Sequence, residues 1–230
     1  MPYRPFLVLL LSLATTAVVP ATTIHTGWND WQAGVTGVQT TDFEGLTGTY
    51  ASYGTATGLM DGEAQFLGIT HQGTYWLYVV NGNAYPDHDY GTGAVLKGPT
   101  FNAAPPSRLR VYLPAAVTAV AFELGVYGAG GAQYTVSLAN GEQWTGIAAG
   151  ARPALTFFGV TSDTPFSQLD IIMTSGMTGL SHTILDNFAY GTASTTPPAG
   201  AEVPETGTLV LVGSGLIAVR GFRCRRLRVG

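Results

Sequence analysis

The segment from His71 to Tyr90 holds the residues of this sequence that are best suited to binding chemistry. It places aromatic side chains beside a short polar run, Asp87-His88-Asp89. Sugars bind proteins by laying their C–H faces on aromatic rings and by giving hydroxyl hydrogen bonds to carboxylates and amides. The segment therefore predicts glycan contact through three rings, those of Trp76, Tyr85 and Tyr90.

The same segment has other interpretations. The rings within Tyr75–Val79 are also expected if this stretch is a strand of the protein core. Asp87 and Asp89 could hold a metal ion weakly, or they could belong to an ordinary solvated loop.

Catalytic motifs are absent from the sequence. The histidines show no metal-ligand spacing such as H-E-x-x-H, and no G-x-S-x-G motif occurs. The fourteen acidic residues could supply a glycosidase pair, but nothing in the sequence selects one. We predict that the protein is not an enzyme, and a secreted carbohydrate-active enzyme is the main alternative.

The elements that position these residues read as short strands rather than helices. Arg108–Leu113 alternates polar and apolar residues, and Thr118–Leu124 does so less cleanly. Asn140-Gly141 lies between two further alternating runs, which predicts a hairpin with a type I′ turn. Strands at intervals of about 8–14 residues, with turn residues between them, predict an all-β, antiparallel β-sandwich that is jelly-roll-like. We expect this domain to span residues 22–190.

Two segments of the expected sandwich resemble strands of jelly-roll carbohydrate-binding modules. These are Thr41–Leu46 and Ile184–Phe188, which resemble the first and last strands of such modules. The resemblance implies a structural Ca²⁺ held by Glu44 and Asp186 with backbone carbonyl oxygens, the ligand type that Ca²⁺ prefers. The alternative is that Asp186 caps a turn and Glu44 faces solvent.

Charge is distributed unevenly along the chain. Residues 22–205 contain four basic residues against fourteen acidic ones, a net charge of −10. A nucleic-acid-binding core would need a basic face, so we expect no nucleic-acid partner. With 46% hydrophobic and only 10% charged residues, the chain is also unlike a disordered acidic protein.

The N-terminus has the order of a secretory signal peptide. Arg4 precedes the apolar run Phe6–Leu13, and small residues follow up to Ala21. We predict a signal peptide over residues 1–21, export by the Sec machinery, and cleavage after Ala21.

The C-terminus has three parts behind a Thr-, Pro-, Ala- and Gly-rich stalk at residues 191–202. A turn motif, Val203-Pro204-Glu205-Thr206-Gly207, precedes an apolar segment at 208–219, and a basic tail covers 220–230. Twelve helical residues span only about 18 Å, which is short of a hydrocarbon core of about 30 Å. The tail carries five arginines, expected on the cytoplasmic face of a membrane: Arg220, Arg223, Arg225, Arg226 and Arg228.

This arrangement resembles the PEP-CTERM sorting signal of Gram-negative bacteria, a tail family also labelled ice-binding protein C-terminal domain. The resemblance covers Val203 to about Arg228 and implies recognition by an exosortase, a membrane protease that acts near the motif. Thr206 departs from the second Pro of the Pro-Glu-Pro core. With Thr206 the motif also resembles the L-P-x-T-G signal of Gram-positive sortases.

Together these features predict an exported surface or extracellular-matrix protein, held transiently in the inner membrane by its C-terminal segment. A structural or adhesive role, with an extracellular polysaccharide as a candidate partner, is the expected function.

Overall fold

The computed structural model describes residues 22–46, 50–53, 57–128, 130–177 and 180–194. The predicted signal peptide, the sorting motif, the apolar segment, the basic tail and all but the first four stalk residues lie outside these ranges. Within the described ranges no helix is long and apolar enough to cross a membrane.

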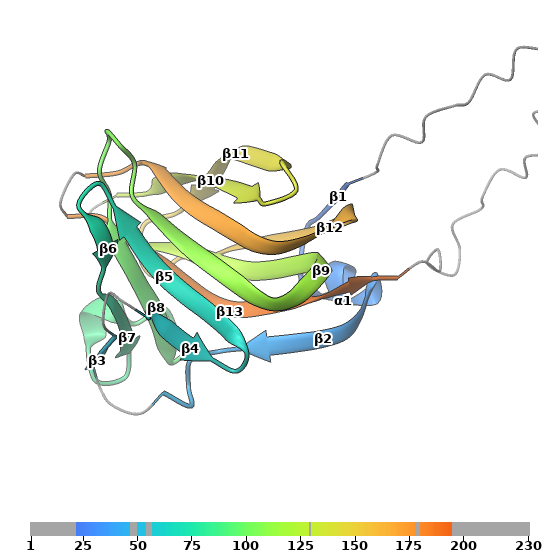
Figure 1. Ribbon diagram of the computed structural model, residues 1–230. Helices are drawn as coiled ribbons and strands as arrows, with labels where there is room; N and C mark the ends of the chain where they lie inside the picture. The colour runs from blue at the N-terminus through green and yellow to red at the C-terminus, as the bar shows by residue number, and fades with distance from the viewer. Residues whose placement is uncertain (1–21, 47–49, 54–56, 129, 178–179, 195–230) are drawn as a thin grey trace, which may run out of the picture. The chain divides into compact units, whose positions relative to one another are not determined.

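The described chain is an antiparallel β-sandwich, as the alternating patterns predicted (Figure 1). Its elements in chain order are β1 (Thr23–His25), α1 (Trp28–Ala33), β2 (Val35–Thr41), β3 (Tyr50–Tyr53), β4 (Leu59–Asp61), β5 (Ala64–Thr70), β6 (Gly73–Tyr75), β7 (Leu77–Asn81), the 3₁₀ helix η1 (Pro86–His88), β8 (Ala94–Thr100), β9 (Arg108–Tyr127), β10 (Ala132–Leu138), β11 (Gln143–Ala149), β12 (Thr156–Ser175) and β13 (His182–Ala193).

Two long strands, β9 and β12, run side by side through the whole sandwich (Figure 1). The first half of β9 and the second half of β12 form one layer with β4, β5, β6, β10 and β11, which we call sheet II. The other halves form the second layer with β1, β2, β3, β7, β8 and β13, which we call sheet I. The two predicted strands Arg108–Leu113 and Thr118–Leu124 are therefore parts of a single strand.

The main core lies between the two layers and is rich in aromatic rings. Phe66 of sheet II meets Phe188 of sheet I edge-on, with ring centroids 5.4 Å apart. Phe188 also stacks on Phe122 at 5.9 Å, and all three rings are fully buried. Aromatic contacts of this kind add to the stabilisation from apolar burial.

The predicted β10–β11 hairpin is present, but its turn type differs from the prediction. Four residues, 139–142, connect the strands, and only Gly141 has a positive φ, of 97°. A type I′ turn needs positive φ at both central residues, so Asn140 excludes it. Asn140 instead accepts a hydrogen bond from the Glu142 N–H through its side chain, at 3.1 Å.

Strand β13 continues to Ala193, three residues beyond the boundary expected at Tyr190. The extension pairs with β2, and the Ser194 N–H donates to the Gly34 carbonyl at 2.7 Å. The folded unit therefore includes the first residues of the expected stalk.

Candidate functional site

Two groups of side chains cover parts of the outer face of sheet I, and they leave a gap between them. At one side Trp31 of α1 packs on the small side chains of Ala119, Ala121 and Ala189. At the other side Tyr90, from the loop between β7 and β8, packs on Ile184. Strand residues between these coverings cannot be buried by either, and they include Glu123 of β9.

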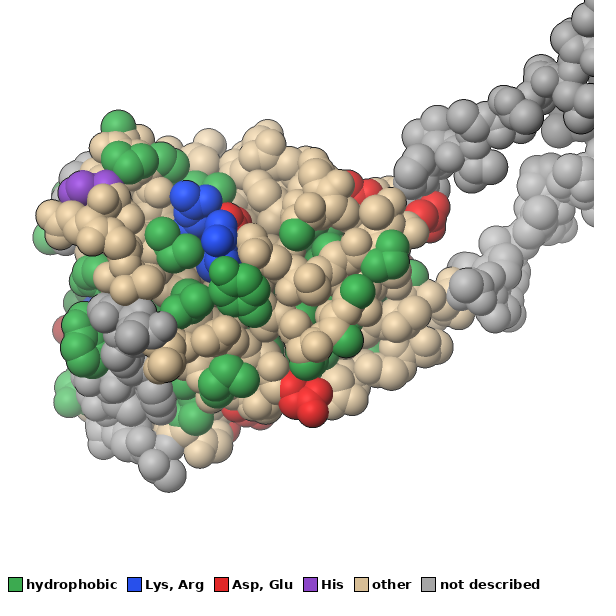
Figure 2. All heavy atoms as spheres, viewed as in Figure 1, with side chains coloured by type: hydrophobic (Ala, Val, Ile, Leu, Met, Phe, Trp, Pro, Cys, Tyr) green, Lys and Arg blue, Asp and Glu red, His purple; other side chains and the backbone are tan. Residues whose placement is uncertain are grey.

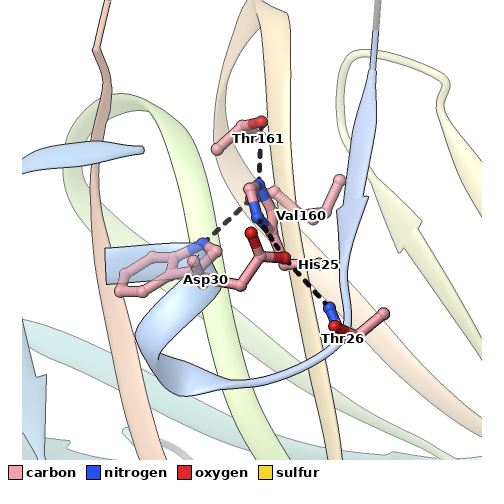
Figure 3. Close-up of polar contacts among 6 residues, drawn as sticks. His25, Thr26, Asp30, Val160 and Thr161 are labelled. Atoms are coloured by element: carbon pink, nitrogen blue, oxygen red, sulfur yellow. Dashed lines mark hydrogen bonds and ion pairs between the residues drawn. The ribbon is translucent and has the colours of Figure 1, made fainter. Parts of the chain in front are cut away.

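Helix α1 is short, but polar contacts fix it to the sheet (Figure 3). The Trp31 indole N–H donates to the carbonyl of Val160 at 3.3 Å, and His25 lies between Asp30 at 3.1 Å and Thr161 at 3.2 Å. The Thr26 N–H donates to the same Asp30 carboxylate, which compensates for the missing side-chain cap at Gly27. These contacts hold the position of Trp28, one helical turn before Trp31.

A cleft of about 460 Å³ opens between α1, the end of β2 and the middle of β9 and β13, and we call it the cleft below Trp28. Its wall combines one aromatic ring with amide, carboxylate and hydroxyl groups, contributed by Trp28, Gln32, Asp42, Thr92, Glu123 and Asn187 together with Thr40 and Thr41. The Trp28 ring is half-buried and rests edge-on against Trp31 and Phe157, with centroid distances of 5.9 and 5.1 Å. The wall therefore offers one apolar surface and several hydrogen-bonding groups to a ligand.

Glu123 connects the two sides of the cleft. Its Oε1 accepts a hydrogen bond from the Trp28 indole N–H at 3.3 Å, and its Oε2 accepts one from the Asn187 side-chain amide at 2.7 Å. Asn187 has a φ of 48° at an irregularity in the β9–β13 pairing, where the partner on the other edge of β13 changes from β8 to β2. This left-handed conformation, which Asn tolerates better than most residues, directs its amide toward Glu123.

Asp186 lies beside this group and is 1% exposed. Its Oδ1 accepts the Asn187 N–H at 2.7 Å, whereas Oδ2 has no hydrogen-bond partner among the described residues. Burial raises the pKa of this carboxyl group to about 7, and the like charges of Glu123 and Glu44 add to the rise. The Thr92 side chain and the Asn187 N–H act in the opposite direction.

Glu44 follows the cleft residue Asp42 by two positions and is fixed by the backbone. Its Oε1 accepts the Ala94 N–H at 2.5 Å, and a Cβ on Gly93 would clash with this same carboxylate. Gly93 has a φ of 99°, so the absence of a side chain is required both for the backbone and for Glu44. Glu44 and Asp186, the pair expected to hold Ca²⁺, are thus close enough for their charges to interact.

The structure holds no group of side chains that would by itself mark a metal site in its described ranges. Among the residues that the structure describes, no three His, Cys, Asp or Glu side chains converge on a point where a metal ion could sit. Asp87 instead pairs with Arg152 at 3.3 Å, and Asp89 accepts the Gly91 N–H at 2.8 Å. Calcium binding by Glu44 and Asp186 stays a prediction.

The three aromatic residues predicted to contact glycans do not form one site. Trp76 and Tyr85 are exposed, at 47% and 41%, but they lie before and after β7, a five-residue strand that spans about 16 Å. Tyr90 is 6% exposed, and its hydroxyl donates to the buried Val126 carbonyl at 2.9 Å. The expectation that Tyr90 offers its ring to a glycan is wrong, because the ring fills the space between its loop and sheet I.

The cleft below Trp28 was missed by sequence reasoning. Its residues come from four separate parts of the chain, and Trp28 is 95 positions from Glu123. One signal was available: Trp28 and Trp31 are spaced to share a face of a short helix, with an amide at Gln32 beside them. No signal pointed to Glu123 or Asn187.

No family model and no curated protein matches this sequence. Among solved structures, carbohydrate-binding modules of family 29 are similar in part. A mutant of CBM29-2 has a TM-score of 0.35 and 14% identity, covering 65% of this chain and 98% of its own. A CBM29-2 mutant complexed with cellulohexaose has a TM-score of 0.36 and 12% identity, covering 70% and 97%. At these scores the likeness is too distant to indicate what this chain binds.

Proposed function

We propose that the folded domain is a non-catalytic glycan-binding module of an exported protein. The observation that carries the proposal is the cleft below Trp28, where an aromatic ring faces side-chain amides, carboxylates and hydroxyls. A sugar ring presents an apolar C–H face and a rim of hydroxyl groups, and this wall offers a partner for each.

The bonding of the acidic groups favours binding over hydrolysis. Both oxygens of Glu123 accept hydrogen bonds from the protein itself, which leaves neither free to act as a base or nucleophile without rearrangement. The other carboxyl group in the described wall, Asp42, accepts the Glu44 N–H through Oδ1 at 3.1 Å, and Asp186 is buried and does not line the cleft. A glycoside hydrolase needs two carboxyl groups directed at the scissile bond.

A glycan array probed with the full-length chain tests the proposal. We expect binding to one or more glycans that Trp28→Ala removes, because the ring supplies the stacking face. Gln32→Ala is the second cleft variant, since this exposed residue contributes little to folding. Binding that survives both changes but is lost in Trp76→Ala or Tyr85→Ala would move the site to those exposed rings. No binding to any glycan would overturn the proposal, and hydrolysis of a polysaccharide would overturn the non-catalytic assignment.

The sorting of the protein rests on its two ends. Export by the Sec machinery and recognition by an exosortase remain the proposal that the signal-peptide pattern and the Val203–Gly207 motif support. Mass spectrometry of the protein released from the cell surface tests it. A new C-terminus near Glu205–Gly207 is expected, and an intact Arg228 on the released protein would contradict processing.

A further inference from the structure

The cleft below Trp28 is acidic and has no basic group in its wall. Asp42 and Glu123 line it, and Glu44 and Asp186 lie close behind. The four basic residues of the described domain are engaged elsewhere. Lys97 lies 4.3 Å from the centroid of the Tyr127 ring, and Arg152 contacts Asp87.

The remaining two basic residues are on sheet II. Arg108 and Arg110 both contact Asp170, at 3.1 and 2.7 Å. On the face of the molecule drawn in Figure 2, the basic side chains accordingly gather in one compact group with an acidic side chain against it. The acidic groups of the cleft therefore have no basic partner among the described residues of its wall, and their negative potential is not neutralised locally.

A further acidic group, Asp186, lies behind this wall. Asp186 Oδ2 is buried and has no hydrogen-bond partner among the described residues, although a buried acceptor normally has one. Its neighbours Thr92 and Asn187 both line the cleft, so this carboxyl group stands directly behind the cleft wall. The negative charge of the wall itself comes from Asp42 and Glu123, with no cationic side chain among its described residues.

The distribution of the carboxylates fits an organic cation better than a metal ion. Glu123 is held by Trp28 and Asn187, and Glu44 is held by the Ala94 N–H, so the acidic groups are fixed apart from one another. Within the described residues no three acidic or histidine side chains converge on one point. An ammonium group needs only one or two acceptors from the wall.

We propose that the cleft selects saccharides that carry free amino groups, such as the hexosamine units of a de-N-acetylated polysaccharide, over neutral and acidic ones. This inference rests on the proposed glycan-binding function. The Trp28 ring takes the C–H face of the sugar, and Asp42 and Glu123 take its ammonium group. Uronates are excluded because their carboxylates would face the same negative charges.

Titration calorimetry of the full-length chain with three oligosaccharides of equal length tests the inference. These are a glucosamine oligomer, its N-acetylated form and a galacturonate oligomer, all at mildly acidic pH and low salt. We expect the glucosamine oligomer to bind about tenfold or more tightly than the N-acetylated form, with no detectable binding of the galacturonate. Added salt is expected to reduce this preference.

Two isosteric variants test whether the carboxylates of the cleft cause the preference for amino sugars. Asp42→Asn keeps the side-chain oxygen that accepts the Glu44 N–H at 3.1 Å, and Glu123→Gln keeps the shape of the wall. Each is expected to reduce the preference for the glucosamine oligomer over its N-acetylated form severalfold. Glu63→Gln, an exposed acid in the turn between β4 and β5, is the matched control and is expected to change nothing.

Different results would contradict the preference for amino sugars and the glycan-binding function. Equal affinity for the amino and N-acetylated oligomers, or a preference unchanged by Asp42→Asn and Glu123→Gln, would overturn the inference and leave glycan binding intact. Binding that requires millimolar Ca²⁺ would also overturn it. No binding of any saccharide would remove the proposed function itself.

Discussion

Glu123 of β9 and Asp186 of β13 lie directly opposite each other in the antiparallel ladder of sheet I, on its outer face. Their neighbours Phe122, Leu124 and Leu185 point the other way, into the core. Like charges on opposed residues destabilise a sheet, and burial of Asp186 increases the cost. Burial and the nearby acidic groups raise the pKa of Asp186 accordingly, whereas Glu123 lines the cleft.

Asp186→Asn tests this raised pKa through the pH dependence of stability. The pKa of Asp186 is raised from 3.8 to about 7, so its contribution to stability is complete below pH 4 and is lost as pH rises through 7. The amide cannot ionise, so the variant is expected to melt several degrees above the wild type at pH 8 and close to it at pH 4. Calorimetry at both pH values measures the difference. An equal difference at pH 4 and pH 8 would show that ionisation of Asp186 is not responsible.

Gly93→Ala tests how the backbone holds Glu44. The new Cβ would clash with the Glu44 carboxylate and displace it from the Ala94 N–H, at a cost of about 1 kcal/mol beyond backbone strain. Gly91→Ala is the matched control, because Gly91 also has a positive φ, of 78°, with no atom close to the new Cβ. Urea denaturation compares the two variants. Equal loss of stability in both would mean that strain alone accounts for the effect.

Lys97→Met tests the electrostatics beside the cleft. Burial first, and the positive charge of Lys97 second, lower the pKa of both His88 and His182 to about 4. Removing that charge is expected to raise both pKa values by roughly one unit, measured by NMR titration of the imidazole protons. Arg108→Met removes a charge on sheet II and serves as the control. Unchanged values in Lys97→Met would exclude the coupling.

Arg110→Met tests the ion-pair network of sheet II. Arg110 makes two hydrogen bonds to Asp170, at 2.7 and 2.8 Å, across the β9–β12 pair. Burial would raise the Asp170 pKa, but hydrogen bonds from Arg110 and Arg108 outweigh it and hold the pKa below the ordinary value. Loss of Arg110 is expected to cost about 2 kcal/mol of unfolding free energy.

Arg108→Met is the comparison for this network, because Arg108 is 40% exposed and makes one contact at 3.1 Å. It is expected to cost less than about 1 kcal/mol. The same cost for both variants in denaturant titrations would contradict the assigned roles. Because the folded Asp170 pKa is depressed, this stabilisation is present above pH 4 and is lost as pH falls further.

The fold was predictable because its signals are local. Alternation along Arg108–Leu113 and around Asn140-Gly141 reports which side chains point inward and where the chain turns. The type of the turn was not predictable, since four-residue and two-residue connections can contain the same Asn-Gly pair. The short helix α1 was also missed, because six residues carry too few turns for a helical period to show.

The candidate site was predictable only in part. Glu44 and Asp186 were named together, and the structure brings their charges close. The cleft itself depends on Trp28, Glu123 and Asn187, which meet only after β9 and β13 have paired. The exposed rings of Trp76 and Tyr85 looked more promising in sequence because they are close along the chain, yet β7 separates them in space.

The most direct test of glycan binding in the cleft below Trp28 uses an oligosaccharide that binds the wild-type chain. It is titrated into the protein while the tryptophan indole N–H signals are followed by NMR. The Trp28 N–H donates to Glu123 at the cleft wall, so a sugar in the cleft must change its environment. We predict that the Trp28 signal shifts and saturates with the binding isotherm, while the exposed Trp76 signal does not move. A saturating shift of Trp76 with an unchanged Trp28 signal would contradict the account.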